Sequence, residues 1–147
     1  LMMVLAKDRV AVEPGDMVCL RTGFAEMLLG MNKQPDVARL FASTSALDGR
    51  DPKLLQWFTD SGLVSLIADY YAVEAHPARP CADDFCATLP LHAHCLFRLG
   101  VNLGEMWQLH ELADWLRANG RSRFLLTAPP LRLPGAVGSP ANPIATV

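Results

Sequence analysis

The sequence lacks any long apolar run and any run of charges of one sign. No apolar stretch approaches the about 20 residues of a membrane-spanning helix, and the short one at Leu1–Leu5 is too brief for a signal peptide and is soon followed by charged residues. The 13 basic and 15 acidic residues give a net charge of −2 and do not cluster by sign. Neither a membrane nor a nucleic acid is therefore an expected partner, which leaves small molecules and other protein subunits.

The sequence also lacks the cysteine motifs of zinc or redox sites and the glycine motifs of phosphate-binding loops. The cysteines stand at Cys19, Cys81, Cys86 and Cys95, and no two of them form the C-x-x-C pair of a structural zinc site or a redox motif. We therefore expect reduced, mostly buried thiols rather than disulfides, and hence a cytoplasmic protein. The glycines of Gly135–Gly138 do not form a phosphate-binding loop, because neither known pattern is present and no helix is expected to follow.

Length and hydrophobic periodicity predict a single α/β domain over residues 1–147. A chain of 147 residues that is 51% apolar has the size and the hydrophobic material for one sizeable core. Asp51 is a good N-cap for a helix that opens at Pro52, and Gly100 and Gly120 are natural helix ends. The predicted strands are 17–22, 63–69, 122–127 and 144–146, and the predicted helices are 24–31, 37–42, 52–61, 90–99 and 109–119. Because strands and helices alternate, the α/β class follows.

Two histidines and a glutamate form the sharpest candidate site. His92 and His94 begin the helix that ends near Leu99, and Glu105 follows the next glycines. One unbroken helix would place residues 94 and 105 about 16 Å apart, but a helix of about 13 Å followed by an extended return of about 17 to 20 Å brings Glu105 back to the helix start. The spacing permits a shared divalent-metal site, and it equally permits histidines that only pack or lie at the surface.

Other polar residues leave their roles open. His92 and His94 lie two apart and point in different directions, so one of them would bind and the other pack. Glu74, at the end of a buried strand, is either a site carboxylate or the ion-pair partner of Arg79, and Asp69 has the same ambiguity.

A series of short motifs runs through nearly the whole chain. They are Gly15–Gly23, Ala46–Arg50, Asp60–Gly62, Ala68–Ala75, His92–Glu105, Ala128–Leu131 and Gly138–Ala145. In this order they resemble the cyclase family that includes kynurenine formamidases and isatin hydrolases. The resemblance implies a swivelling β/α/β-type fold. It also implies a zinc- or manganese-dependent hydrolase of small-molecule amides or lactams, such as the arylformamidases of tryptophan catabolism. The full-length protein is then expected to be a homo-oligomer.

The resemblance also assigns metal ligands. It carries the family's histidine and later glutamate onto His92 and Glu105, with His94 in reserve if the register shifts by two, and it assigns no catalytic residue. Asp69-Tyr70 departs from the Asp-Asn expected at this segment.

The family's principal metal motif, His-x-Gly-Thr-His-x-Asp-x-Pro, is absent from these residues. The expectation is therefore an incomplete cyclase fold, the C-terminal portion of a longer hydrolase with its N-terminal part missing, which is inactive alone because a catalytic zinc usually has three protein ligands. The alternative is a non-catalytic α/β binding or subunit-interface module that retains the fold without the metal chemistry.

Overall fold

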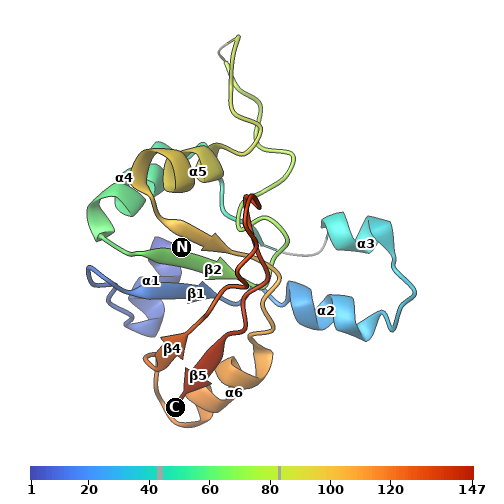
Figure 1. Cartoon of the computed structure of the whole chain (residues 1–147), viewed down its shortest axis with the longest axis vertical. Helices are drawn as coiled ribbons and strands as arrows, with labels where there is room; N and C mark the ends of the chain where they lie inside the picture. Colours follow the sequence, from blue (N-terminus) through green and yellow to red (C-terminus); the bar gives the residue numbers. More distant parts are fainter. Residues whose placement is uncertain (43–44, 83) are drawn as a thin grey trace. The chain divides into compact units, whose positions relative to one another are not determined.

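The computed structural model describes residues 1–42, 45–82 and 84–147. The chain forms two compact units, Leu1–His110 and Glu111–Val147, and each is described here by itself. Helices and strands are mixed in both units (Figure 1), which agrees with the predicted α/β class. The single domain and the swivelling β/α/β-type fold stay predictions. No helix of the described residues is long and apolar enough to cross a membrane.

A three-stranded parallel sheet forms the centre of the first unit. Its strands are β1 (Met17–Leu20), β2 (Ser65–Ala68) and β3 (Asn102–Gly104), in the order β1-β2-β3. In register, Leu66 pairs with Val18 on one side and with Leu103 on the other. Three of the four residues of β2 are buried, as the short apolar run predicts for a central strand that is covered on both faces.

The helices of the first unit begin and end close to the predicted positions. They are α1 (Met2–Asp8), α2 (Phe24–Gly30), α3 (Val37–Ala42), α4 (Pro52–Ser61) and α5 (Pro90–His92), and α5 continues as a π-helix, η1 (Ala93–Leu99). The Asp51 carboxylate caps α4 by accepting hydrogen bonds from the backbone N–H groups of Lys53 (2.8 Å) and Leu54 (3.0 Å), and Gly62 ends the helix with φ 67°. Among the described elements of this unit, helix α1 has no sequence prediction, and strand β3 was expected only as an extended return after Gly100.

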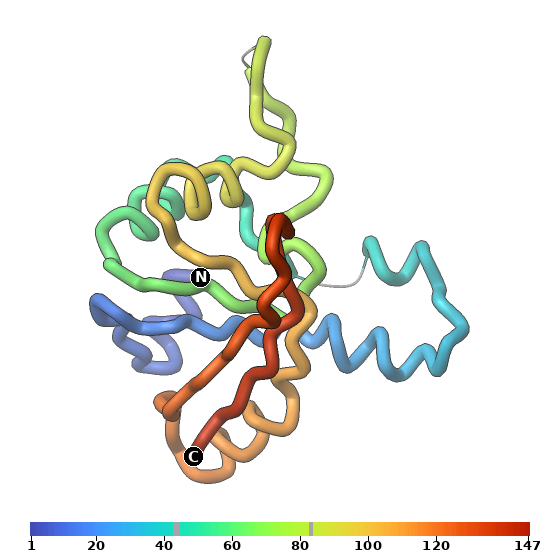
Figure 2. Tube along the Cα trace, in the orientation of Figure 1, coloured from blue at the N-terminus to red at the C-terminus, as the bar shows by residue number. Residues whose placement is uncertain are grey.

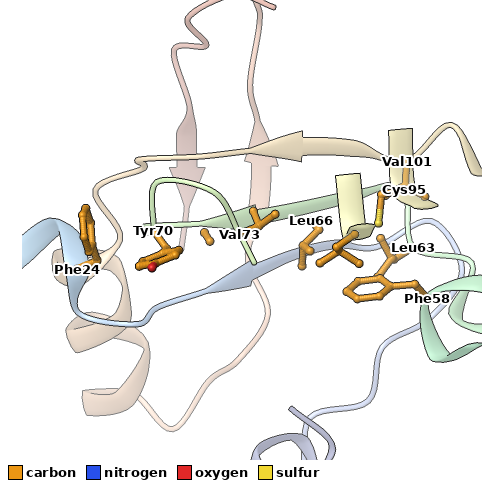
Figure 3. Close-up of a cluster of buried hydrophobic side chains, with 10 residues drawn as sticks. Phe24, Phe58, Leu63, Leu66, Tyr70, Val73, Cys95 and Val101 are labelled. Carbon is orange, nitrogen blue, oxygen red and sulfur yellow. The ribbon is translucent and has the colours of Figure 1, made fainter. Parts of the chain in front are cut away.

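The hydrophobic core joins β2 to α4 and to the α5–η1 helix (Figure 3). Its fully buried side chains include Phe58 of α4, Leu66 of β2, Leu91 of α5 and Cys95 of η1. Burial of an aromatic or aliphatic side chain of this size contributes about 1.5–3 kcal/mol. Leu91 and Cys95 therefore anchor the helix that carries His92.

The second unit consists of α6 (His110–Ala118), whose first residue marks the unit boundary, and an antiparallel pair of strands. These strands are β4 (Leu125–Thr127) and β5 (Ile144–Thr146), and Leu126 pairs with Ala145. The long connection between them is held by a bridge between Pro130 and Ala141. Both strands and the helix lie within the predicted ranges.

The cysteines correct one prediction. Cys81 and Cys86 form a disulfide, whereas Cys19 and Cys95 are free. The expectation of four reduced thiols is wrong for this pair, whose Cα atoms lie 6.4 Å apart, a separation that a disulfide spans. Burial raises the pKa of the Cys95 thiol to about 11, so this residue behaves as the inert, buried thiol that was expected.

Candidate metal-binding site

Polar side chains follow all three strands of the parallel sheet, at the edge where ligands of open α/β sheets usually bind. Thr22 follows β1, Asp69 follows β2, and Glu105 follows β3. The buried carboxylate of Asp69 accepts hydrogen bonds from the Thr22 backbone N–H (2.7 Å), the Thr22 hydroxyl (2.8 Å) and the Gly23 N–H (2.8 Å). Asp69 therefore holds the turn between β1 and α2, and its oxygen atoms are occupied by this task.

Glu74 lies beyond the end of β2 with a side chain that is fully buried. Its Oε2 accepts a hydrogen bond from the Leu91 N–H, and its Oε1 accepts one from the His92 N–H, both at 2.9 Å. The same Oε1 lies 2.8 Å from His92 Nδ1. Arg79, the alternative partner, pairs instead with Asp48 at 3.3 Å.

The turn before α4 packs directly against this carboxylate. The Ala75 N–H donates a 2.8 Å hydrogen bond to the Leu47 carbonyl, and Leu47 and Glu74 form an isolated parallel β-bridge. Gly49 is buried, and a Cβ there would overlap Glu74 Oε2 and would lie 2.9 Å from the Leu91 nitrogen. Only a glycine fits beside the carboxylate in this arrangement.

The imidazole of His92 lies between two carboxylates. Its Nδ1 faces Glu74, and its Nε2 lies 3.1 Å from Glu105 Oε1. The side chain of His92 is 21% exposed, that of Glu74 0% and that of Glu105 33%. Glu105 first and Glu74 second raise the pKa of His92 to about 9, against the opposing effect of burial, because both carboxylates stabilise the imidazolium.

Glu105 Oε1 is a buried oxygen that accepts no hydrogen bond from the residues that the structure describes. Its 3.1 Å approach to His92 Nε2 is a contact between charges rather than an aligned hydrogen bond. A buried oxygen with unused lone pairs beside an imidazole nitrogen is a donor set that suits a divalent cation such as zinc or manganese. His92 and Glu105 therefore fit such an ion as two ligands.

Two donors are fewer than a closed site needs. Among the residues that the structure describes, no three His, Cys, Asp or Glu side chains are grouped so as to hold a metal ion. His94 does not join the pair, because its Nε2 lies 3.0 Å from the Thr59 hydroxyl of α4. The structure thus brings together His92 and Glu105, as the helix-and-return geometry allows, and directs His94 elsewhere.

The contact between Glu74 and His92 was not foreseen in the sequence. The signal that pointed to Glu74 was a carboxylate directly after a buried strand, but nothing local connects it with a histidine 18 residues later. Gly49 was likewise visible only as a turn residue, since its close approach to Glu74 depends on tertiary structure.

Comparison with known proteins places this chain beside a solved cyclase structure. No family model matches the chain, and no curated protein matches it. Among solved structures, a crystal structure described as that of a novel cyclase superimposes with a TM-score of 0.78 and 35% sequence identity. The match covers 97% of this chain and 44% of that chain, so this chain spans less than half the length of that cyclase.

Proposed function

Since the likeness to a solved cyclase supports the cyclase family for this chain, we propose that residues 1–147 contribute His92 and Glu105 to the divalent-metal centre of a hydrolase. Its substrates are small-molecule amides or cyclic amides, and the metal is zinc or manganese. The centre requires at least one further donor besides this pair, because catalytic zinc sites usually have three protein ligands.

The row of Glu74, His92 and Glu105 is the observation that carries the proposal. Glu74 accepts a hydrogen bond from His92 Nδ1–H, and Nε2 is directed toward Glu105 Oε1. Metal-binding histidines generally make this second contact, in which a carboxylate or carbonyl fixes the ring and raises its basicity. The two carboxylates and a neutral imidazole carry two negative charges, which balance a divalent cation.

Each of the three residues has a separate task. When bound, a divalent metal supplies the polarisation of the scissile carbonyl and the acidification of a water molecule. His92 Nε2 and Glu105 Oε1 bind the ion, and Glu74 holds the proton at His92 Nδ1 and keeps the ring in one orientation. The backbone N–H groups of Leu91 and His92 fix the Glu74 carboxylate in turn, so the side chain that holds the ring is itself held by backbone.

Binding is tested by titrating the chain with Mn²⁺ and following paramagnetic broadening in NMR spectra, a method that detects weak sites. We expect the His92 ring and Glu105 side-chain signals to broaden first, and His92→Ala and Glu105→Gln to abolish the selectivity. His94→Ala is the matched control, because it removes the same ring two residues away, and it should leave the selectivity intact. If only His94→Ala abolishes it, the ligand is His94; if the unaltered chain shows no selective broadening, the metal site is refuted.

Hydrolysis is tested with the protein from the complete reading frame, loaded with zinc or manganese, on a panel of small amides and lactams. Release of the free carboxylate should depend on added metal and should fall at least about a hundredfold in His92→Ala, because loss of a ligand should cost no less than the upper range for loss of a ligand's outer-shell partner. If the metal-loaded protein hydrolyses none of the panel, the proposed hydrolysis of amides is refuted, and only the proposal of a metal-binding protein remains.

A further inference from the structure

The chain leaves the candidate site after Glu74 and returns to it at Leu91. Residues 75–82 extend away from the sheet as one limb, and residues 84–90 come back beside it as a second limb (Figure 2). The Cys81–Cys86 disulfide links the limbs. Glu74 and His92 therefore lie close to the two ends of this excursion.

Arg50 holds both limbs at the base. Its Nε donates a 2.7 Å hydrogen bond to the carbonyl of Arg79 on the outgoing limb, and its Nη2 donates a 2.9 Å hydrogen bond to the carbonyl of Ala87 on the returning limb. A guanidinium is planar and presents its N–H groups at fixed angles, so one side chain sets the separation of the two carbonyls. Ala87 lies only a few residues before Leu91 and His92.

Arg79 reciprocates and fixes the turn from which Arg50 projects. Its Nη2 donates to the Arg50 carbonyl at 3.0 Å, and its Nε lies 3.3 Å from Asp48 Oδ2. Asp48 also accepts a 3.0 Å hydrogen bond from the Arg50 N–H. The neighbouring Gly49 packs against Glu74. The turn of residues 48–50 therefore contacts the Glu74 carboxylate through Gly49 and both limbs of the excursion through Arg50.

We propose that Arg50 is a positioning residue for the candidate metal site, which it serves by holding the base of the excursion so that Leu91 and His92 reach the Glu74 carboxylate. The metal role of the site rests on the proposed function, whereas the positioning of Glu74 and His92 does not. Arg50 contacts neither His92 nor Glu105 in the bonds described, and it acts through the backbone of residues 79 and 87.

Two substitutions of Arg50 distinguish the effect of its hydrogen bonds to the limbs from the effect of its positive charge. Arg50→Ala removes both hydrogen bonds to the limbs, and Arg50→Lys keeps the positive charge but lacks the planar pair of donors. Arg117→Ala is the control, because it removes an arginine whose side chain also has a polar partner, Asp114 at 3.6 Å, but which lies in the second unit. A thiol reductant is present throughout, so that the disulfide does not hold the limbs in place of the guanidinium.

Amide hydrogen exchange in the metal-free chain is the first readout. The Leu91 and His92 amides, which donate to Glu74, should exchange about tenfold faster in Arg50→Ala relative to the Leu66 and Ile67 amides of β2, with a smaller increase in Arg50→Lys and none in the control. Equal acceleration of all four amides would assign Arg50 a general stabilising role and overturn the proposal, as would unchanged exchange. If Arg50→Ala does not fold, Arg50→Lys decides the question by the same comparison.

Zinc affinity is the second readout. Arg50→Ala should weaken binding of Zn²⁺ about tenfold, the lower range for loss of an outer support of a metal ligand. Unchanged affinity in this variant would refute the positioning role. Failure of the unaltered chain to bind zinc would refute the metal site alone, because the exchange comparison is made without metal.

Discussion

Replacement of Gly49 by alanine should disrupt the candidate site by adding a single methyl group. The new Cβ would overlap Glu74 Oε2 and would lie 2.9 Å from both the Leu91 nitrogen and Pro90 Cγ. Real Cβ atoms do not approach other atoms so closely, and two of these three neighbours are backbone or a stiff ring. The Glu74 carboxylate must therefore move away from the N–H groups of Leu91 and His92.

The magnitude follows from the hydrogen bonds that Glu74 would lose. Each bond to a charged acceptor contributes about 1.5–3 kcal/mol, and displacement of the carboxylate weakens both backbone bonds together. Alanine lowers the conformational entropy of the unfolded chain, which stabilises the folded protein by about 0.4–1 kcal/mol. This gain applies at position 49 because Gly49 does not have a positive φ. If both bonds are lost, we expect a net decrease of about 2–5 kcal/mol in the free energy of unfolding.

Urea unfolding followed by tryptophan fluorescence and circular dichroism measures this loss. Gly30→Ala is the matched control, because Gly30 ends α2 with open space around its Cα and no positive φ, so alanine there should be neutral or slightly stabilising. NMR should also show the His92 pKa falling from about 9 in Gly49→Ala, as its contact with Glu74 weakens. Unfolding within about 0.5 kcal/mol of the unaltered chain, with an unchanged His92 pKa, would refute the close packing described for this turn.

Three further predictions concern the sheet edge, the ion pairs and the core. Asp69→Asn should cost about 2–3 kcal/mol in urea unfolding, because its amide would either turn an N–H toward the Gly23 N–H or present donors to Thr22; an unchanged midpoint would contradict this. The pKa of His92 is raised from its ordinary 6.5, so its stabilisation of the metal-free chain should be complete below pH 6.5 and be lost as the pH rises through about 9. The loss should be on the order of 2 kcal/mol and absent in His92→Gln, and a parallel pH dependence in both proteins would count against it. Phe58→Ala should cost about 3–5 kcal/mol because the side chain is 1% exposed in the core, and a cost below about 1 kcal/mol would show that it is not packed there.

The elements that the sequence predicted are those with strong local signals. The capped helix after Asp51 and the apolar strand β2 lie where their patterns place them, because caps and burial periodicity act within a few residues. Helix α1 was missed for the converse reason: it buries no residue, and its N-cap Leu1 forms no side-chain capping bond. Nothing in its periodicity distinguishes it from a loop.

The candidate site was foreseen only in part, since its contacts are non-local. A helix followed by an extended return was enough to bring Glu105 to His92, because helix rise and strand length are fixed by backbone geometry. The choice between His92 and His94 depended on side-chain direction, and the role of Glu74 depended on a loop that departs and returns. Neither can be read from spacing alone, and the disulfide in that loop was missed because two cysteines five residues apart fit both oxidation states.

The π-helix η1 has a consequence for how the two proposed ligands are separated in sequence. A π-turn arises when an α-helix accommodates an additional residue without losing its ends, and η1 lies between His92 and Gly100. The twelve residues between His92 and Glu105 therefore include this wider helical turn, so their number depends on the local helix geometry as well as on where the two proposed ligands lie. Deletion of one residue within η1, which would allow an ordinary α-helical turn, should disturb the approach of His92 to Glu105 less than deletion of one residue from β3.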